Sequence, residues 1–423
     1  MVRPPAALRP LLDGFVPVRV TDLRGVDLRA LPFDFDLTLS VLTLHADGTV
    51  LHRYGGRDHR DPEAFLSLAS YEAFLRASLA SHAGHVVAPV GPGSADETGS
   101  PGLSGELPGD ASSRRSGDRM APGPAQARLP WPMGEPATAE LAPLVLERVP
   151  AYAAKDKGAC IHCHSVYPAL HAEAVRAGTW EDAERWRYPG PARLGLTLDR
   201  DDQRRVVAVA EGSVAETAGV TVGDRLASLD EVRLATATDL MFALDRLPAG
   251  GATVDLRVER PSRQPDGDRV LTMSLDLADG WKRTEPERYA WRPFKWAFTP
   301  QPGFGGRALT AAELVAAGLV APEVLEADGA DATGAPPLPF ALRVTYLVTW
   351  GDRARYGRAA AAAGLRGGDV VVAVTGREGT PATFTSPDHL HAWWRLTREV
   401  GETVRLEVLR GGARRVLELD VLP

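Results

Sequence analysis

The residues best suited to chemistry form one short run near the middle of the chain, Cys160-Ile161-His162-Cys163-His164. The spacing Cys-x-x-Cys-His is the one used for covalent haem attachment. Two thiols on one helical turn reach the two vinyl groups, and the adjacent imidazole can ligate the iron. The motif therefore predicts a haem c site, with Cys160 and Cys163 as the attachment points and His164 as the iron ligand.

Two other interpretations of these residues remain open. A zinc site needs four ligands, and Cys160, Cys163, His164 and His171 form a cramped set that matches no usual zinc spacing. A reversible disulfide between the two thiols is the second alternative, with neighbouring imidazoles stabilising the thiolates. The haem interpretation has its own weakness, because no methionine stands at a suitable place to supply the sixth ligand.

Length and charge exclude several functions. A chain of 423 residues predicts roughly two to four domains. Its net charge of −7 argues against nucleic acid as the partner, because phosphate binding needs a basic field. No apolar run approaches the ~18–20 residues of a membrane span, and residues 1–13 do not form a secretory signal. We expect a cytoplasmic location, or the periplasm or cell envelope if the true start lies upstream of Met1.

Residues 1–83 are predicted to form a small α/β unit. Strands are expected at Val16–Val20, Leu37–Leu44 and Thr49–Tyr54, and the last two are joined by an Asp-Gly hairpin turn. A helix is expected over Pro62–Ser81 from its apolar spacing. This order resembles the C-terminal part of a thioredoxin-like fold. The redox Cys-x-x-Cys and the cis-proline of that family are absent, so the unit is either redox-inactive or N-terminally truncated.

Three connecting segments separate the folded parts. Residues 84–142 are rich in Gly, Pro and Ser, which predicts a disordered linker. Residues 143–187 hold the cysteine motif and are expected to be helical. Residues 283–337 are expected to be a second linker. Its aromatic residues either pack between domains or form an exposed binding strip: Trp291, Phe294, Trp296 and Phe298.

The clearest organising feature is a repeat. Residues 218–226 read AGVTVGDRL, and residues 363–371 read AGLRGGDVV. The first glycine of each run ends a helix in the left-handed conformation, and the later glycine turns the chain into a strand. A helix-like segment follows in each case, and then a strand that ends in arginine, Thr253–Arg260 and Thr403–Arg410.

This pattern resembles the PDZ domain in the form associated with bacterial envelope proteases, present twice, at residues 188–282 and 338–423. The expected fold class is therefore multidomain, α/β and mainly β, with a partial thioredoxin-like unit followed by two PDZ-like β-barrel or sandwich domains. The whole order resembles a bacterial family of thioredoxin-like and PDZ domain (seleno)proteins.

The resemblance implies a peptide-binding groove in the first repeat. A PDZ domain adds an extended peptide to a sheet edge and holds its carboxylate in a loop of the type apolar-Gly-apolar. The matching residues are Leu194, Gly195 and Leu196, preceded by Arg193, whose charge would assist an anionic terminus. Thr197 would begin the accepting strand.

A helix at residues 238–247 would line that groove, with Leu240 and Leu244 as pocket residues. The second repeat departs from the pattern, because its expected first strand, Phe340–Val344, lacks the glycine. We therefore expect the second repeat to be degraded as a terminus binder.

The resulting hypothesis is a protein-interaction scaffold. Its first PDZ-like domain would bind C-terminal or extended peptide segments, and the Cys160–His164 segment would carry haem c or a redox thiol pair. The alternative is a thiol-disulfide oxidoreductase that uses Cys160 and Cys163, with the PDZ-like domains recruiting substrates. Whether the chain is an enzyme stays undecided, since no nucleophile–histidine–acid set and no phosphate-binding loop is recognisable.

Overall fold

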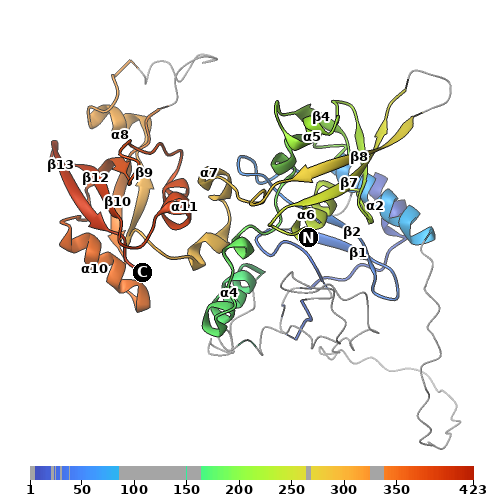
Figure 1. The fold of residues 1–423 in the computed structure, drawn as a ribbon, viewed down its shortest axis with the longest axis horizontal. Helices are drawn as coiled ribbons and strands as arrows, with labels where there is room; N and C mark the ends of the chain where they lie inside the picture. Colours follow the sequence, from blue (N-terminus) through green and yellow to red (C-terminus); the bar gives the residue numbers. More distant parts are fainter. Residues whose placement is uncertain are drawn as a thin grey trace, which may run out of the picture.

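The computed structural model describes residues 5–20, 23, 25–28, 31–37, 39–84, 149, 163–262, 268–323 and 338–423. Over these ranges the chain is mixed α/β, with several small antiparallel sheets (Figure 1). The expected barrels do not form there, because each sheet keeps two open edges instead of closing on itself. No helix in the described part is long and apolar enough to cross a membrane. Of the expected disordered linker, 84–142, all but Gly84 lies outside the described residues.

A hairpin and one long helix make up the N-terminal unit. Strand β1 (Ser40–Leu44) pairs antiparallel with β2 (Val50–Gly55), and the predicted Asp-Gly turn joins them, with Gly48 at a φ of 85°. Helix α2 (Leu68–Ala83) starts at Ser67, whose side chain caps the first turn. Its apolar side packs on the hairpin through an aromatic cluster.

The strand predicted at Val16–Val20 does not form. These residues follow the short helices η1 (Ala6–Leu8) and α1 (Arg9–Leu12), and their valines are exposed. A strand needs a backbone partner, and Pro17 removes one of the donors that a partner would use. The thioredoxin-like identity of the unit stays a prediction.

The segment that begins at Cys163, in the second half of the cysteine motif, contains three short helices. It comprises η3 (Cys163–Ser165), α4 (Val166–Ala177) and η4 (Asp182–Arg185). Helix α4 ends at Gly178, which has a φ of 70°. Its buried face joins an apolar cluster that also contains aromatic residues from 33–35 and 289–298.

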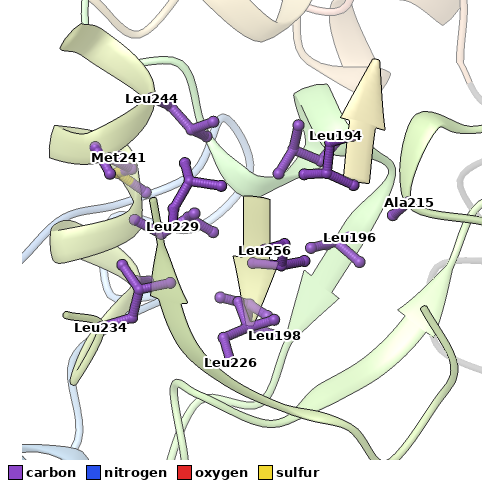
Figure 2. Packing of buried hydrophobic residues seen from close by; sticks show 14 of the residues in the cluster. Leu194, Leu196, Leu198, Ala215, Leu226, Leu229, Leu234, Met241, Leu244 and Leu256 are labelled. Carbon is purple, nitrogen blue, oxygen red and sulfur yellow. The ribbon is translucent and has the colours of Figure 1, made fainter. Parts of the chain in front are cut away.

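The first repeat builds a two-stranded sheet, β3-β4, and a four-stranded sheet in the order β6-β5-β7-β8. The leucines of both sheets and of α6 meet in one core (Figure 2). Its elements are η5 (Pro191–Leu194), β3 (Leu196–Leu198), β4 (Val206–Val209), α5 (Val214–Thr217), β5 (Arg225–Leu229), β6 (Val232–Arg233), α6 (Ala237–Arg246), β7 (Ala252–Arg260) and β8 (Arg269–Leu277).

The second repeat forms a five-stranded sheet in the order β13-β12-β11-β10-β9. Strand β9 lies inside 283–337, the segment expected to be a linker, so the sheet begins earlier in the sequence than the repeat pattern indicated. The elements from the connection onward are α7 (Pro286–Tyr289), η6 (Pro293–Ala297), β9 (Phe304–Ala308), α8 (Ala311–Ala316), β10 (Leu342–Leu347), η7 (Gly351–Arg353), α10 (Ala354–Ala362), β11 (Val370–Thr375), α11 (Pro387–Thr397), β12 (Thr403–Arg410) and β13 (Ala413–Asp420).

An ion-pair clamp between a buried aspartate and a partly exposed arginine occurs in both repeats. In the first, the guanidinium of Arg260 donates to both carboxylate oxygens of Asp224, at 2.7 and 2.8 Å. In the second, Arg410 donates to both oxygens of Asp369, each at 2.7 Å. Each arginine also donates to the carbonyl of a glycine shortly after a helix, Gly219 after α5 and Gly364 after α10. The sequence repeat is therefore also a repeat of three-dimensional structure.

A buried ion cluster joins the N-terminal unit to the rest of the chain. Arg292 donates to Asp34 at 2.8 Å and to Asp36 at 3.1 Å. Tyr167 of α4 donates its hydroxyl to Asp34 at 3.2 Å. One oxygen of Asp36 has no hydrogen-bond partner. Three separate parts of the sequence thus share one desolvated charge cluster, which makes it sensitive to protonation.

We expect this cluster to weaken the fold as the pH rises. Burial, opposed by Arg292 and reinforced by Asp34, raises the pKa of Asp36 from 3.8 to about 7. The folded state then holds a proton that the unfolded state releases, so the free energy of unfolding should fall between about pH 4 and pH 7. In the Asp36→Asn variant, the free energy of unfolding should fall less steeply with pH, by up to about 1.4 kcal/mol per pH unit. Urea unfolding of both proteins at pH 5 and pH 7 measures the difference.

The exposed Asp276→Asn variant is the matched control. Its stability should track the unmodified protein at both pH values. If Asp36→Asn also tracks the unmodified protein, the buried carboxyl does not exchange its proton in this range.

Candidate functional site

The loop predicted to hold a peptide terminus in the first repeat has the expected backbone. Gly195 has a φ of 85°, and a Cβ built on it would lie 2.1 Å from the Cβ of Ser213, so only glycine fits. The N–H of Ala210 donates to the Gly195 carbonyl at 2.8 Å. By the alternation of an antiparallel ladder, the N–H and C=O of the next residue, Leu196, point to the outer edge of β3.

The predicted pocket side chains, in contrast, belong to the core. Leu194 and Leu196 point into the same buried cluster as Leu240 and Leu244 of α6. Figure 2 shows Leu194, Leu196 and Leu244 converging from opposite sides of that cluster. Thr197 is exposed on β3. These leucines therefore stabilise the domain and do not line an open groove.

The outer face of α6 is covered by the N-terminal hairpin. Thr238 donates its hydroxyl to the carbonyl of Gly55 at 2.8 Å. Asp239 accepts the backbone N–H of Arg53 at 2.9 Å and lies 2.9 Å from Nδ1 of His52. Both α6 side chains are fully buried. Strand β2 is thus bound to the helix that was expected to face a peptide.

The segment after β2 occupies the same region. Phe65 belongs to the first repeat's core together with Leu198 and Met241. Its carbonyl accepts the side-chain amide of Gln203 at 2.6 Å, and that same side chain accepts the N–H of Ala237, the first residue of α6, at 3.1 Å. The protein's own N-terminal unit therefore fills one end of the space between β3 and α6.

The other end is closed by side chains of the first repeat and the segment that follows it. The guanidinium of Arg193 donates to the carbonyl of Trp281 at 2.8 Å and to Glu285 at 3.1 Å. Asp245, near the end of α6, accepts the N–H of Tyr188 at 2.9 Å. Arg193 is already paired, so peptide binding at this groove would have to displace both this contact and the hairpin.

An equivalent loop stands at the start of the second repeat. The N–H of Val348 donates to the carbonyl of Gly303 at 2.8 Å, which is the bond that Ala210 makes to Gly195. Gly303 has a φ of 74°, and a Cβ on it would lie 2.2 Å from the carbonyl oxygen of Tyr356. Residues 302–304 are therefore the second apolar-Gly-apolar loop, which the sequence analysis did not find.

A pocket of about 270 Å³ opens beside this loop, between α11 and the end of β10. Among the described residues, no acidic side chain lines it. Its walls are aromatic and its polar groups are mainly donors. The aromatic walls are Trp296, Phe304, Tyr346 and Trp350, and the polar groups belong to Gln301, Arg353, His391 and Arg395.

Arg395 is the unusual residue of this pocket. It is 3% exposed, donates to the carbonyl of Phe298 at 2.7 Å, and leaves its Nε without a hydrogen-bond partner. No carboxylate of the described residues pairs with it, whereas Arg398, also buried, pairs with Glu378 and Glu402. Burial lowers the pKa of Arg395 to about 9. Its guanidinium carbon lies 4.9 Å from the centre of the Trp296 ring, and a buried cation without a paired carboxylate is costly.

His391 faces the same pocket. Its Nδ1 is buried and unpartnered, and its ring lies 4.9 Å from that of Trp296. Burial, together with Arg395 and Lys295, lowers the pKa of His391 to about 3, so the ring is neutral at physiological pH. Counted from the helix N-caps, Arg395 and His391 occupy the positions that Asp245 and Met241 hold in α6. At the position of Arg395 and Asp245, the two repeats therefore carry opposite charges.

The cysteine motif is described in part, since Cys160 lies outside the described residues. Cys163 is half-buried against the cluster that contains Phe35, and burial raises the pKa of its thiol. Nδ1 of His164 lies 3.1 Å from the carbonyl of Phe35, so it carries the proton and leaves Nε2 with the lone pair. That tautomer suits an iron ligand, and haem c stays a prediction for Cys160, Cys163 and His164.

His171 does not converge with these residues. Its ring packs edge-on to Trp180 at 4.4 Å and lies 5.6 Å from Phe298. Burial, with Arg185, lowers the pKa of His171 to about 4. Within the described ranges no three His, Cys, Asp or Glu side chains come together as a metal site requires.

No protein-family model and no curated protein matches the chain. Function therefore has to be inferred from the molecule's own contacts.

The docking of β2 on α6 generates a stability prediction. Asp239 also accepts the N–H of Ala235 at 3.1 Å, so Asp239→Ala would leave buried donors of three residues without an acceptor. We expect the free energy of unfolding to fall by about 2–4 kcal/mol, measured by urea unfolding. Asp276→Ala, at an exposed strand position, should change it by less than about 0.5 kcal/mol. Equal values for the two variants would show that the hairpin is not held by Asp239.

Proposed function

We propose that the second repeat binds the C-terminal end of another protein chain, laid along β9 with its carboxylate in the pocket beside Gly303. The observation that carries the proposal is Arg395, a buried guanidinium that no described carboxylate pairs with and that lines a pocket with no acidic side chain among the described residues. This keeps the expected class of partner, peptide C-termini or extended segments. It moves the site from the first repeat to the second.

The edge of β9 is suited to accept a strand. Strand β9 ends the five-stranded sheet. Val348 donates to Gly303 at one end of it and Leu309 donates to Ala341 at the other, both inward toward β10. The even-numbered residues of β9 therefore direct their N–H and C=O groups outward, where an added peptide would bond to them.

The pocket supplies the remaining contacts for a chain end. Phe304, Gln301 and Arg395 all line the pocket, and they carry an outward N–H, a side-chain amide and a guanidinium as donors. A hydrogen bond between a guanidinium and a carboxylate is roughly twice as strong as a neutral one. A free carboxylate at this place would supply the counter-charge that Arg395 lacks.

The first repeat has a different role in this proposal. Its groove region is filled by the N-terminal hairpin and by paired side chains, so it holds the N-terminal unit in place. In this proposal the second repeat binds the partner and the first repeat holds the N-terminal unit. The Cys160–His164 segment lies between the N-terminal unit and the first repeat in the sequence. The protein would act as a scaffold that presents one binding site.

The carboxylate contact can be tested with a pool of fluorescein-labelled hexapeptides whose last two positions are varied. We expect the pool with a free C-terminus to bind, and the amidated pool to bind at least tenfold more weakly in fluorescence polarisation. Arg395→Gln should reduce binding of the free pool by a similar factor, because it removes the charge that holds the carboxylate.

Arg405→Gln, an exposed arginine on β12, is the matched control and should bind as the unmodified protein does. Thermal unfolding checks that Arg395→Gln is folded. Equal affinity for free and amidated pools would overturn the proposal without relying on any variant.

The rival function, thiol-disulfide exchange, makes an opposite prediction at Cys163. Exchange needs a thiolate, and burial raises the pKa of Cys163 above its ordinary value near 9. In a Cys160→Ser variant we therefore expect iodoacetamide labelling of Cys163 to be slow at pH 7 and still to accelerate above pH 9. A labelling rate that reaches its plateau below pH 8 would favour the oxidoreductase instead.

A further inference from the structure

The binding pocket holds two guanidinium groups, one more than a single chain terminus requires. Arg395 reaches it from α11 and Arg353 from η7. Arg353 forms no ion pair within the described part of the chain, and its sequence neighbour Asp352 does not line the pocket. One bound carboxylate would therefore leave a second cation unpaired at the same place.

The two arginines are close enough to act on each other. After burial, Arg353 is the next cause of the lowered pKa of Arg395. They differ in surroundings, because Arg395 is nearly inaccessible and Arg353 is exposed at the rim. Arg395 is therefore suited to bind the carboxylate at the end of a chain, and Arg353 is suited to bind a group on the side chain of the last residue.

The size of the pocket agrees with a short ligand. Its volume of about 270 Å³ lies just below the ~300–1,000 Å³ typical of sites for drug-sized molecules. The walls next to Arg353 are Tyr346 and Trp350, whose rings lie 5.7 Å apart. A terminal residue with a short, flat side chain fits between rings and guanidinium better than a bulky apolar one.

We infer that the pocket selects chains that end in aspartate or glutamate. The α-carboxylate would bind Arg395 and the N–H of Phe304, and the side-chain carboxylate would bind Arg353. This inference rests on the proposed function, because it names the last residue of the same ligand. We expect this selectivity only in the second repeat, because in the first repeat a carboxylate, Asp245, occupies the position of Arg395.

The test uses five fluorescein-labelled hexapeptides that differ only at the C-terminus: Asp, Glu, Asn and Leu with free carboxylates, and Asp as the amide. Fluorescence polarisation with the full chain should give at least tenfold tighter binding for Asp and Glu than for Asn and Leu. In Arg353→Gln the Asp and Asn peptides should bind about equally, whereas the affinity for the Leu peptide stays unchanged.

Arg358→Gln is the matched control, since Arg358 is an exposed arginine of the adjoining helix α10 that does not line the pocket. It should keep the full preference for Asp over Asn. Arg353 is exposed, so its replacement should leave thermal unfolding unchanged and a lost preference cannot be blamed on misfolding.

The outcomes separate the two levels of inference. If none of the free peptides binds, the proposed function fails and the inference fails with it. If Asn and Leu peptides bind as tightly as Asp and Glu, the repeat binds chain ends and only the selectivity is wrong. If the preference persists in Arg353→Gln, a different residue reads the terminal side chain and the assignment of Arg353 is overturned.

Discussion

The arrangement of the molecule depends on how the first turn of α6 meets the backbone of β2. The backbone groups at a strand edge normally bond to another strand, but here side chains at the start of α6 bond to those of β2. Two threonine hydroxyls donate to carbonyls of β2, and Asp239 accepts one of its N–H groups. These groups are buried, so separating the two surfaces would leave several polar atoms unbonded. The contact makes the N-terminal unit an integral part of the first repeat.

The repeats show how one scaffold supports two opposite electrostatic environments. Both keep the Asp–Arg clamp and a left-handed glycine before the first strand of the repeat. They diverge near the end of the helix, where Asp245 accepts a backbone amide and Arg395 has an unpartnered nitrogen. A buried acid satisfied by the chain stabilises a closed structure. A buried base without an acid stores unfavourable desolvation energy that a bound anion can relieve.

Much of the local structure could be predicted from the sequence, because it depends on neighbouring residues. The Asp-Gly hairpin, the helix after it and the glycines of the repeat all follow from short-range preferences. The position of β9 could not, since residues 309–341 separate it from β10 and Gly305-Gly306 have low strand propensity. The docking of Thr238 and Asp239 was equally hidden, because polar residues at a helix start usually face water. Whether Arg395 finds a carboxylate depends on contacts distant in sequence.

The Asp–Arg clamp has a consequence for the two long hairpins. It anchors each hairpin at the last residue of its first strand, before the return strands β8 and β13 bring apolar side chains back to the cores. The first hairpin has the nine-residue strands β7 and β8, whereas a tight Gly411-Gly412 reversal joins β12 to β13 in the second. The exposed Gly411-Gly412 reversal is consequently a position where extra sequence, such as a fluorophore tag or an epitope, can be grafted while the Asp–Arg clamp stays intact.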